Sequence, residues 1–161
     1  MAEFTQDFID ELISCEKTVV QPPKKQMAVV GDHFRNDMTL VALKHEYTFA
    51  VFMRKSCIFE ENFTIGLQYV LPEGGRITIL RCNGPHGEHC NDLPGGDHFM
   101  GYHIHKATEE AIASDCKPEI QAELTTEYST YDDAFCYFLS ACNVIDRHKY
   151  YPSKGQMSLI D

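Results

Sequence analysis

The apolar residues at the start of the chain repeat with a helical period. They recur every three or four positions, at Phe4, Phe8, Ile9, Leu12 and Ile13. Acidic residues fill the positions between them. This spacing predicts an amphipathic N-terminal helix. Pro22 and Pro23 should end this helix or begin the linker after it, because proline cannot continue a helix.

From about residue 26 the pattern changes to runs of β-branched and aromatic residues, several of which alternate with polar ones. These runs predict strands. They cover residues 27–34, 38–45, 47–55, 63–71 and 76–83. Short polar breaks at 35–37 and 45–46, and a glycine-containing turn at 72–75, predict hairpins between them. Strands with such short links must pair antiparallel.

After a glycine-rich loop at residues 84–96, residues 98–106 predict a sixth strand. Residues 107–114 are typical of a short helix, and we expect residues 115–128 to be irregular or weakly helical. A better helix should begin after Ser129 or Thr130, with acidic residues in its first turn. Its apolar stripe consists of Phe135, Phe138, Leu139 and Cys142.

These elements predict an α+β fold, in which an antiparallel meander sheet of about six strands is flanked by an N-terminal and a C-terminal helix. We expect residues 1–148 to form a single domain and residues 149–161 to form a loosely held tail. Helices would cover one face of the sheet and leave the other partly open. An open face that ends in a histidine-bearing strand is a natural place for a site.

The chain carries a formal net charge of -10, which opposes non-specific binding to phosphate backbones. The acidity lies at the two ends, however. Residues 21–106 contain nine Lys or Arg and nine Asp or Glu. A locally positive groove in this central part is therefore compatible with the composition, although a broadly basic face is not.

The cysteines and the hydropathy pattern point to a cytoplasmic protein. Seven cysteines without a C-x-x-C pair suggest reduced thiols, several of them in the core. The first twenty residues lack the features of a secretion signal, and no apolar run approaches the length of a membrane span. We therefore expect no membrane association.

Five of the eight histidines lie between residues 86 and 105. Histidine titrates near neutral pH and is the commonest neutral metal ligand, so this density favours a chemical site. In a strand His103 and His105 would point to one face, while Ile104 and Lys106 would point to the other. Ile104 is the better core residue, so we expect the two histidines to face a cleft or solvent.

Pairing of strands 75–82 and 98–106 would bring other groups towards this face. Arg81 leaves the first of these strands, and His86 and His89 follow in the loop. For each histidine taken alone, an ordinary solvated or hydrogen-bonded role is the simpler interpretation. For the cluster of five histidines as a whole, a functional role is the better interpretation.

The first functional hypothesis is metal-free cleavage of phosphodiester bonds. Two histidines can serve as general base and general acid towards an RNA 2′-hydroxyl and the leaving oxygen. A nearby cation would stabilise the charge that develops on the phosphate. The catalytic candidates are His103, His105, His86 and Arg81, and the substrate-binding candidates are Lys106, His89 and Asn83.

Two other interpretations stay open. A metal-binding hydrolase would use zinc or another divalent cation, held by His103, His105, Glu109 and His86. A protein-interaction module would use the sheet edge or the acidic helices, with the histidines in structural roles. The leading hypothesis itself requires no cofactor, and the oligomeric state is not determined by the sequence.

The histidine segment resembles an uncharacterised family of small bacterial proteins. The matching residues are an N-G-P-H-G-E-H loop at 83–89 and an H-x-H-x-A-T strand end at 103–108. The same order of features is similar to that of TumE-like toxins of toxin–antitoxin modules. That resemblance implies a bacterial toxin- or defence-related protein with a nuclease-like site, and it implies RNA as substrate and an antitoxin as partner. This chain differs by having a loop histidine at His89 and acidic extensions at both ends.

Overall fold

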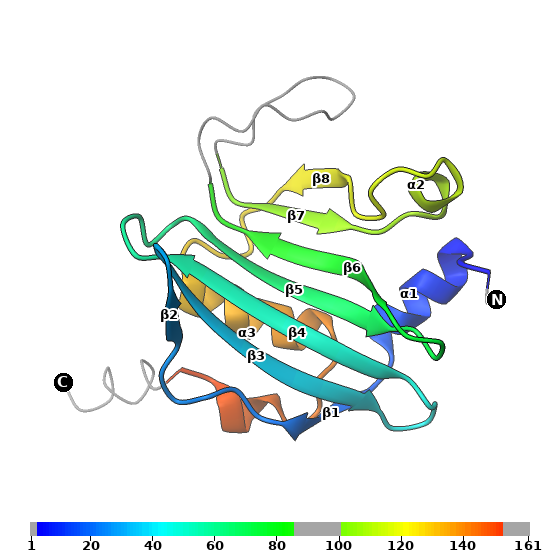
Figure 1. Cartoon of the computed structure of the whole chain (residues 1–161), viewed down its shortest axis with the longest axis horizontal. Coiled ribbons are helices and arrows are strands. Elements are labelled where there is room, and N and C mark those ends of the chain that lie inside the picture. Colours follow the sequence, from blue (N-terminus) through cyan, green and yellow to red (C-terminus); the bar gives the residue numbers. More distant parts are fainter. Residues whose placement is uncertain (1–2, 86–100, 153–161) are drawn as a thin grey trace.

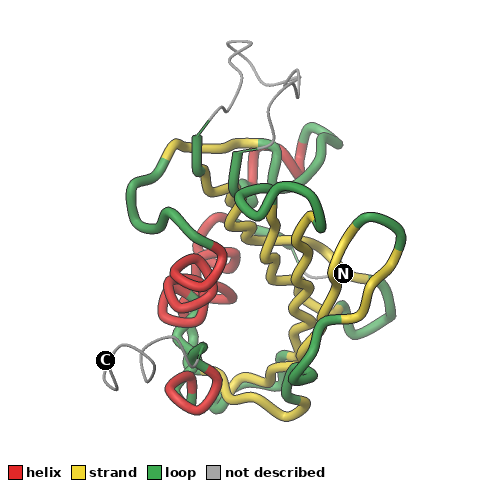
Figure 2. The backbone as a smooth tube through the Cα atoms, turned by 90° about the vertical axis from the view of Figure 1, so that its left-hand side faces the viewer, coloured by secondary structure: helices red, strands yellow, loops and turns green. Residues whose placement is uncertain are grey.

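The computed structural model describes residues 3–85 and 101–152. It shows an α+β fold in which helices lie on one side of a curved antiparallel sheet (Figure 2). The elements follow the order α1 (Gln6–Ser14), β1 (Lys17–Gln21), β2 (Ala28–Val30), β3 (His33–Ala42), β4 (Thr48–Ser56), β5 (Phe63–Val70), β6 (Arg76–Asn83), β7 (His103–Lys106), α2 (Glu109–Ala113), β8 (Gln121–Leu124), α3 (Tyr131–Ala141) and a 3-10 helix, η1 (Arg147–Tyr150). The predicted fold class is confirmed.

The sheet runs in the order β1-β3-β4-β5-β6-β7-β8, and β2 also pairs with β3 (Figure 1). All of these strand pairs are antiparallel, so most of the sheet is the expected meander of hairpins. Figure 1 views the sheet from its uncovered side, with α3 behind the strands. We call this side the open face.

Alternation along the strands places the core between the sheet and the helices. On β3 and β4 every second side chain is buried, and these include Met38, Leu40, Phe49 and Val51. They pack with Ile9 and Leu12 of α1 and with the apolar stripe of α3. Each of the three α-helices has a threonine N-cap, and Thr130 is the cap of α3 as the sequence allowed.

The structure corrects the predicted break at residues 35–37. His33–Ala42 is one continuous strand, and the turn lies earlier, at Gly31 and Asp32. Asn36 is of a residue type that is common in turns, but its side chain bonds to a backbone segment twelve residues earlier in the chain. Its side-chain amide accepts a hydrogen bond from Lys24 N and donates one to Lys24 O. Arg35 and Asp37 are exposed because they point to the open face.

Two strands were not predicted. β1 follows directly after α1, and β8 lies within the segment that was expected to be irregular. Both are short and have little alternation, and each is held by pairing with a neighbouring strand, β1 with β3 and β8 with β7. The expected boundary at residue 148 falls inside η1, and Tyr150 and Tyr151 pack against the core. Residues 153–161 of the predicted tail lie outside the described residues.

The cysteines in the described residues are free thiols, and Cys82 and Cys142 are buried in the core as expected. The longest described helix, α3, has eleven residues. None of the helices in residues 3–85 and 101–152 combines the length and the apolar character that a bilayer span requires.

Candidate active site on the open face

The pairing of β6 with β7 brings four of the predicted site residues together. Arg81 lies opposite His105, and Asn83 lies opposite His103. Directly paired residues in antiparallel strands share one face of the sheet. All four side chains therefore lie on the open face. The register thus places Arg81 beside the histidine pair, which is the first requirement of the first functional hypothesis.

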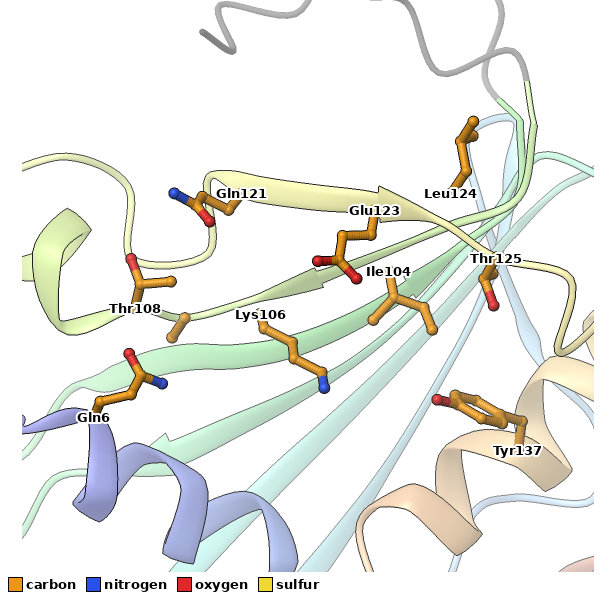
Figure 3. A pocket seen from close by; sticks show the side chains of 10 residues that line it. Gln6, Ile104, Lys106, Thr108, Gln121, Glu123, Leu124, Thr125 and Tyr137 are labelled. Carbon is orange, nitrogen blue, oxygen red and sulfur yellow. The ribbon is translucent and has the colours of Figure 1, made fainter.

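Lys106 lies on the other side of β7. Its register partner is Leu80, which belongs to the core face. Its side chain enters a cavity of about 360 Å³ between α1, α3 and strands β7 and β8. Figure 3 shows it there with Glu123 and with Tyr137 of α3. Lys106 is thus separated from the histidine pair by the sheet, and the structure does not bring it to the predicted substrate.

Both histidines are buried, which contradicts the prediction that they face solvent or an open cleft. His103 has no exposed surface, and His105 is 8% exposed. Their rings pack edge to face with centroids 5.1 Å apart. Ile104, the expected core residue, is half-buried and packs against the core on the helix side. Both faces of β7 are therefore covered.

Glu119 joins Arg81 and His105, and sequence reasoning did not identify it. It lies just before β8, and its Oε2 is 3.0 Å from Arg81 Nε. Its backbone oxygen is 2.9 Å from His105 Nδ1. The Glu119 side chain is almost fully buried, so the carboxylate and the guanidinium form a shielded ion pair. No motif marks this residue, because the chain separates it from Arg81 by 38 positions.

The hydrogen bonds fix the proton positions on both imidazoles. His103 Nδ1 is 2.9 Å from the backbone oxygen of Gly101, and His105 Nδ1 faces the Glu119 oxygen. A carbonyl oxygen can only accept, so Nδ1 carries the proton in each ring. In the neutral form the Nε2 of each histidine is then the basic nitrogen.

Burial keeps both histidines neutral at physiological pH. It lowers the pKa of His103, and the positive charge of Arg81 lowers it further. The same two causes lower the pKa of His105 to about 3. Burial also lowers the pKa of Arg81, and the Glu119 carboxylate opposes this shift. Arginine stays protonated at any physiological pH. The site therefore combines two neutral bases with one fixed cation.

Beside this pair the open face is hollowed and positively charged. The hollow measures about 340 Å³ and lies over β3 to β6. Its basic lining residues are Arg35, Arg54, Arg76, Arg81 and Lys117, and its acidic ones are Asp37 and Glu119. Five cations against two anions give the hollow a charge of +3, in a chain whose net charge is -10. The locally positive groove that the composition allowed is thus present.

The remaining predicted residues do not form a site in the described part of the chain. His86 and His89 lie outside the described residues. Glu109, the proposed carboxylate ligand, is in the first turn of α2, where its backbone N–H donates to Gln6 Oε1. Within residues 3–85 and 101–152 no group of three or more His, Cys, Asp or Glu could hold a metal ion.

The chain was also compared with known proteins. No family model, no curated protein and no solved structure matches it.

Proposed function

We propose that this protein cleaves RNA phosphodiester bonds at Arg81, His103 and His105. The observation that supports the proposal is the register of β6 and β7, which puts a guanidinium opposite a neutral imidazole with a second imidazole beside it. This group adjoins the +3 hollow, the part of an acidic protein where a polyanion would be attracted.

The first step of metal-free RNA cleavage needs an unprotonated base, and His103 is the better candidate, because a pKa of about 3 leaves His105 only weakly basic. The Nε2 of a neutral histidine accepts the proton of the 2′-hydroxyl, and the 2′-oxygen forms a bond to the adjacent phosphorus. The bond from phosphorus to the 5′-oxygen breaks, and the products are a 2′,3′-cyclic phosphate and a 5′-hydroxyl. Arg81 stabilises the extra negative charge on the phosphate during this step.

The protonation states of the two histidines change the catalytic roles that the sequence predicted for them. Because the pKa of His105 is about 3, its imidazolium form is rare at neutral pH. His103 therefore acts as the base, and neither histidine supplies the general acid before the reaction begins. In this proposal the leaving 5′-oxygen takes its proton from a solvent water molecule, and His103 returns the proton of the 2′-hydroxyl to the hydroxide that remains.

Glu119 controls access to Arg81 in this proposal. Its carboxylate occupies the guanidinium, where a substrate phosphate would bind. A phosphate and a carboxylate compete for the same donors because both accept charge-assisted hydrogen bonds from arginine. Binding of RNA therefore requires the substrate phosphate to displace the Glu119 carboxylate, while the Glu119 backbone oxygen still accepts the hydrogen bond from His105 Nδ1.

The test is cleavage of a fluorogenic RNA by the purified chain, with products identified by mass spectrometry. His103→Asn and His105→Asn each keep a donor near Nδ1 but remove the basic Nε2. We expect His103→Asn to lose at least about 100-fold in cleavage rate, in line with the loss of a general base, and His105→Asn to lose less because the pKa of His105 is about 3. His45→Ala, in the β3–β4 turn, is the matched control and should cleave normally. Thermal unfolding checks that every variant is folded.

Four further outcomes decide between the hypotheses. Cleavage should persist in EDTA, whereas loss of cleavage there would support the metal-dependent alternative. An RNA with 2′-O-methyl groups should not be cleaved. Equal cleavage by native protein and the His103→Asn/His105→Asn double variant would refute the proposal. Absence of cleavage, together with an unaltered cellular effect of the double variant, would support the interaction module. The predicted antitoxin partner stays a prediction.

A further inference from the structure

Two arginines face each other on neighbouring strands of the open face. Arg35 of β3 and Arg54 of β4 are direct register partners, and both are exposed and line the hollow. Directly opposed residues on one face have their Cβ atoms about 5 Å apart, so like charges in such a pair are destabilising. The fold therefore maintains an unfavourable pair at this position.

Neither charge is compensated within the part of the chain that the structure describes. No carboxylate lies within 4.0 Å of either guanidinium there, although Asp37 lines the same hollow. Two adjacent guanidinium groups offer paired donors of the kind that bind a phosphate oxygen bidentately. An anionic ligand bridging them would turn the repulsion into attraction.

An aromatic ring lies between this arginine pair and the proposed catalytic group. Phe52 of β4 crosses over Gly66 of β5, where an added Cβ would overlap the tip of the ring. The register continues from Gly66 to Arg81 and on to His105. Phe52, Gly66, Arg81 and His105 thus form one row across the sheet.

The neighbouring row connects the arginine pair with the second histidine. It runs from Arg35 and Arg54 through Thr64 and Asn83 to His103. Three strand spacings separate Arg54 from His103, which is about 14 Å. A short extended strand of nucleic acid can span this distance. The two rows lie side by side, so phosphate-binding and stacking groups follow the same path to the histidines.

We propose that the open face binds single-stranded RNA, with one phosphate held between Arg35 and Arg54 and a base stacked on Phe52. This inference rests on the proposed function, because it supplies the substrate path to Arg81 and the histidine pair. A single strand is favoured over a duplex because only unpaired bases can stack on an aromatic side chain of a sheet. An acidic peptide would use the arginines but would gain nothing specific from Phe52.

The test is fluorescence anisotropy with the full chain and a labelled 2′-O-methyl RNA, which binds without being cleaved. We expect the single strand to bind at least about tenfold more tightly than a duplex of the same sequence. Phe52→Leu should weaken single-strand binding by about tenfold, the effect of losing one stacked base. If about three phosphates are neutralised, the logarithm of the affinity should fall with the logarithm of salt with a slope of about -2.

A charge-reversal pair tests the arginines. Arg54→Glu should weaken binding by more than about tenfold and make the salt slope shallower by about 0.7. Lys44→Glu carries the same change of charge, but its side chain is outside the hollow, and it should bind almost normally. Because Arg54→Glu pairs a glutamate with Arg35, its urea midpoint should equal or exceed that of the native protein. Loss of affinity without loss of stability would support a binding role.

Three results would overturn the inference. Equal affinity for duplex and single strand, with no effect of Phe52→Leu, would exclude stacking. Binding of polyglutamate as tight as that of RNA would indicate an acidic protein partner. If inorganic phosphate displaced the RNA completely at concentrations near its own dissociation constant, the hollow would be a simple phosphate site. If RNA binds as expected but a cleavable RNA stays intact, the proposed function fails and this inference stands. If Arg54→Glu and Phe52→Leu cleave RNA normally, the proposed function stands and this inference fails.

Discussion

The strongest stability prediction concerns Lys17, a buried lysine that connects the two long helices. Its side chain has no exposed surface, and its ammonium donates three hydrogen bonds. They reach Ile13 O at 2.7 Å, Cys15 O at 2.9 Å and Cys142 O at 2.8 Å. The first two carbonyls lie at the end of α1, and the third belongs to the C-cap of α3. Lys17 thus satisfies carbonyls that helix ends leave without partners.

The size of the effect follows from these contacts. Lys17→Met keeps the length and apolar stem of the side chain but leaves three carbonyls without their donor. At about 2 kcal/mol for each unsatisfied acceptor the three carbonyls together cost about 6 kcal/mol, and water that reaches the part-buried carbonyls of Ile13 and Cys15 lowers this to about 5 kcal/mol. Removing a buried charge also relieves a desolvation penalty of several kcal/mol. We expect a net loss of about 2–4 kcal/mol in the free energy of unfolding.

Urea unfolding followed by circular dichroism, with reductant present for the free thiols, measures this loss. Lys44→Met is the matched control, because it makes the same chemical change at a side chain that is 82% exposed. The control should change stability by less than about 0.5 kcal/mol. A loss below about 1 kcal/mol for Lys17→Met would refute the reasoning, since it would mean that the three hydrogen bonds barely exceed the cost of burying the charge.

Two further predictions concern the open face. Since burial and Arg81 lower the pKa of His105 to about 3, the unfolded chain binds more protons than the folded one between about pH 6.5 and pH 3. The contribution of His105 to the free energy of unfolding is thus complete at neutral pH. It is lost on acidification, at up to about 1.4 kcal/mol per pH unit. In urea unfolding at several pH values His105→Asn should show a shallower slope than native protein, and equal slopes would contradict the assigned pKa. Gly66→Ala should force the Phe52 ring aside and cost about 1 kcal/mol or more. The same change in a Phe52→Ala background should cost much less, and additive losses in the double-mutant cycle would show that the ring does not occupy the glycine.

The sequence predicted the elements whose signal is local. The stripe from Phe4 to Ile13 predicted α1, and the threonine cap with its acidic first turn predicted α3. Alternation in 47–55, 63–71 and 76–83 predicted three successive strands, and the turn at 72–75 predicted their last hairpin. The period of side chains and the chemistry of caps and turns depend on neighbouring residues alone, which is why these predictions were confirmed.

Errors occurred where a distant partner decides the conformation. Residues 35–37 resemble a turn, but Asn36 bonds to the backbone of Lys24, and the strand continues through it. β8 has almost no pattern of its own and forms because β7 offers a pairing edge. His103 and His105 were expected at a cleft, yet their burial depends on neighbours that the strand sequence does not show.

The sequence alone determined that His103 and His105 share a face and that a positive groove could exist in an acidic chain. Only the tertiary structure decided that Arg81 and Asn83 join the histidines, that Lys106 does not, and that Glu119 closes over Arg81. It also placed Arg35 against Arg54. The physical reason is that side-chain direction within a strand is fixed by the backbone period, whereas strand register and the path of a connecting segment depend on contacts between residues far apart in the chain.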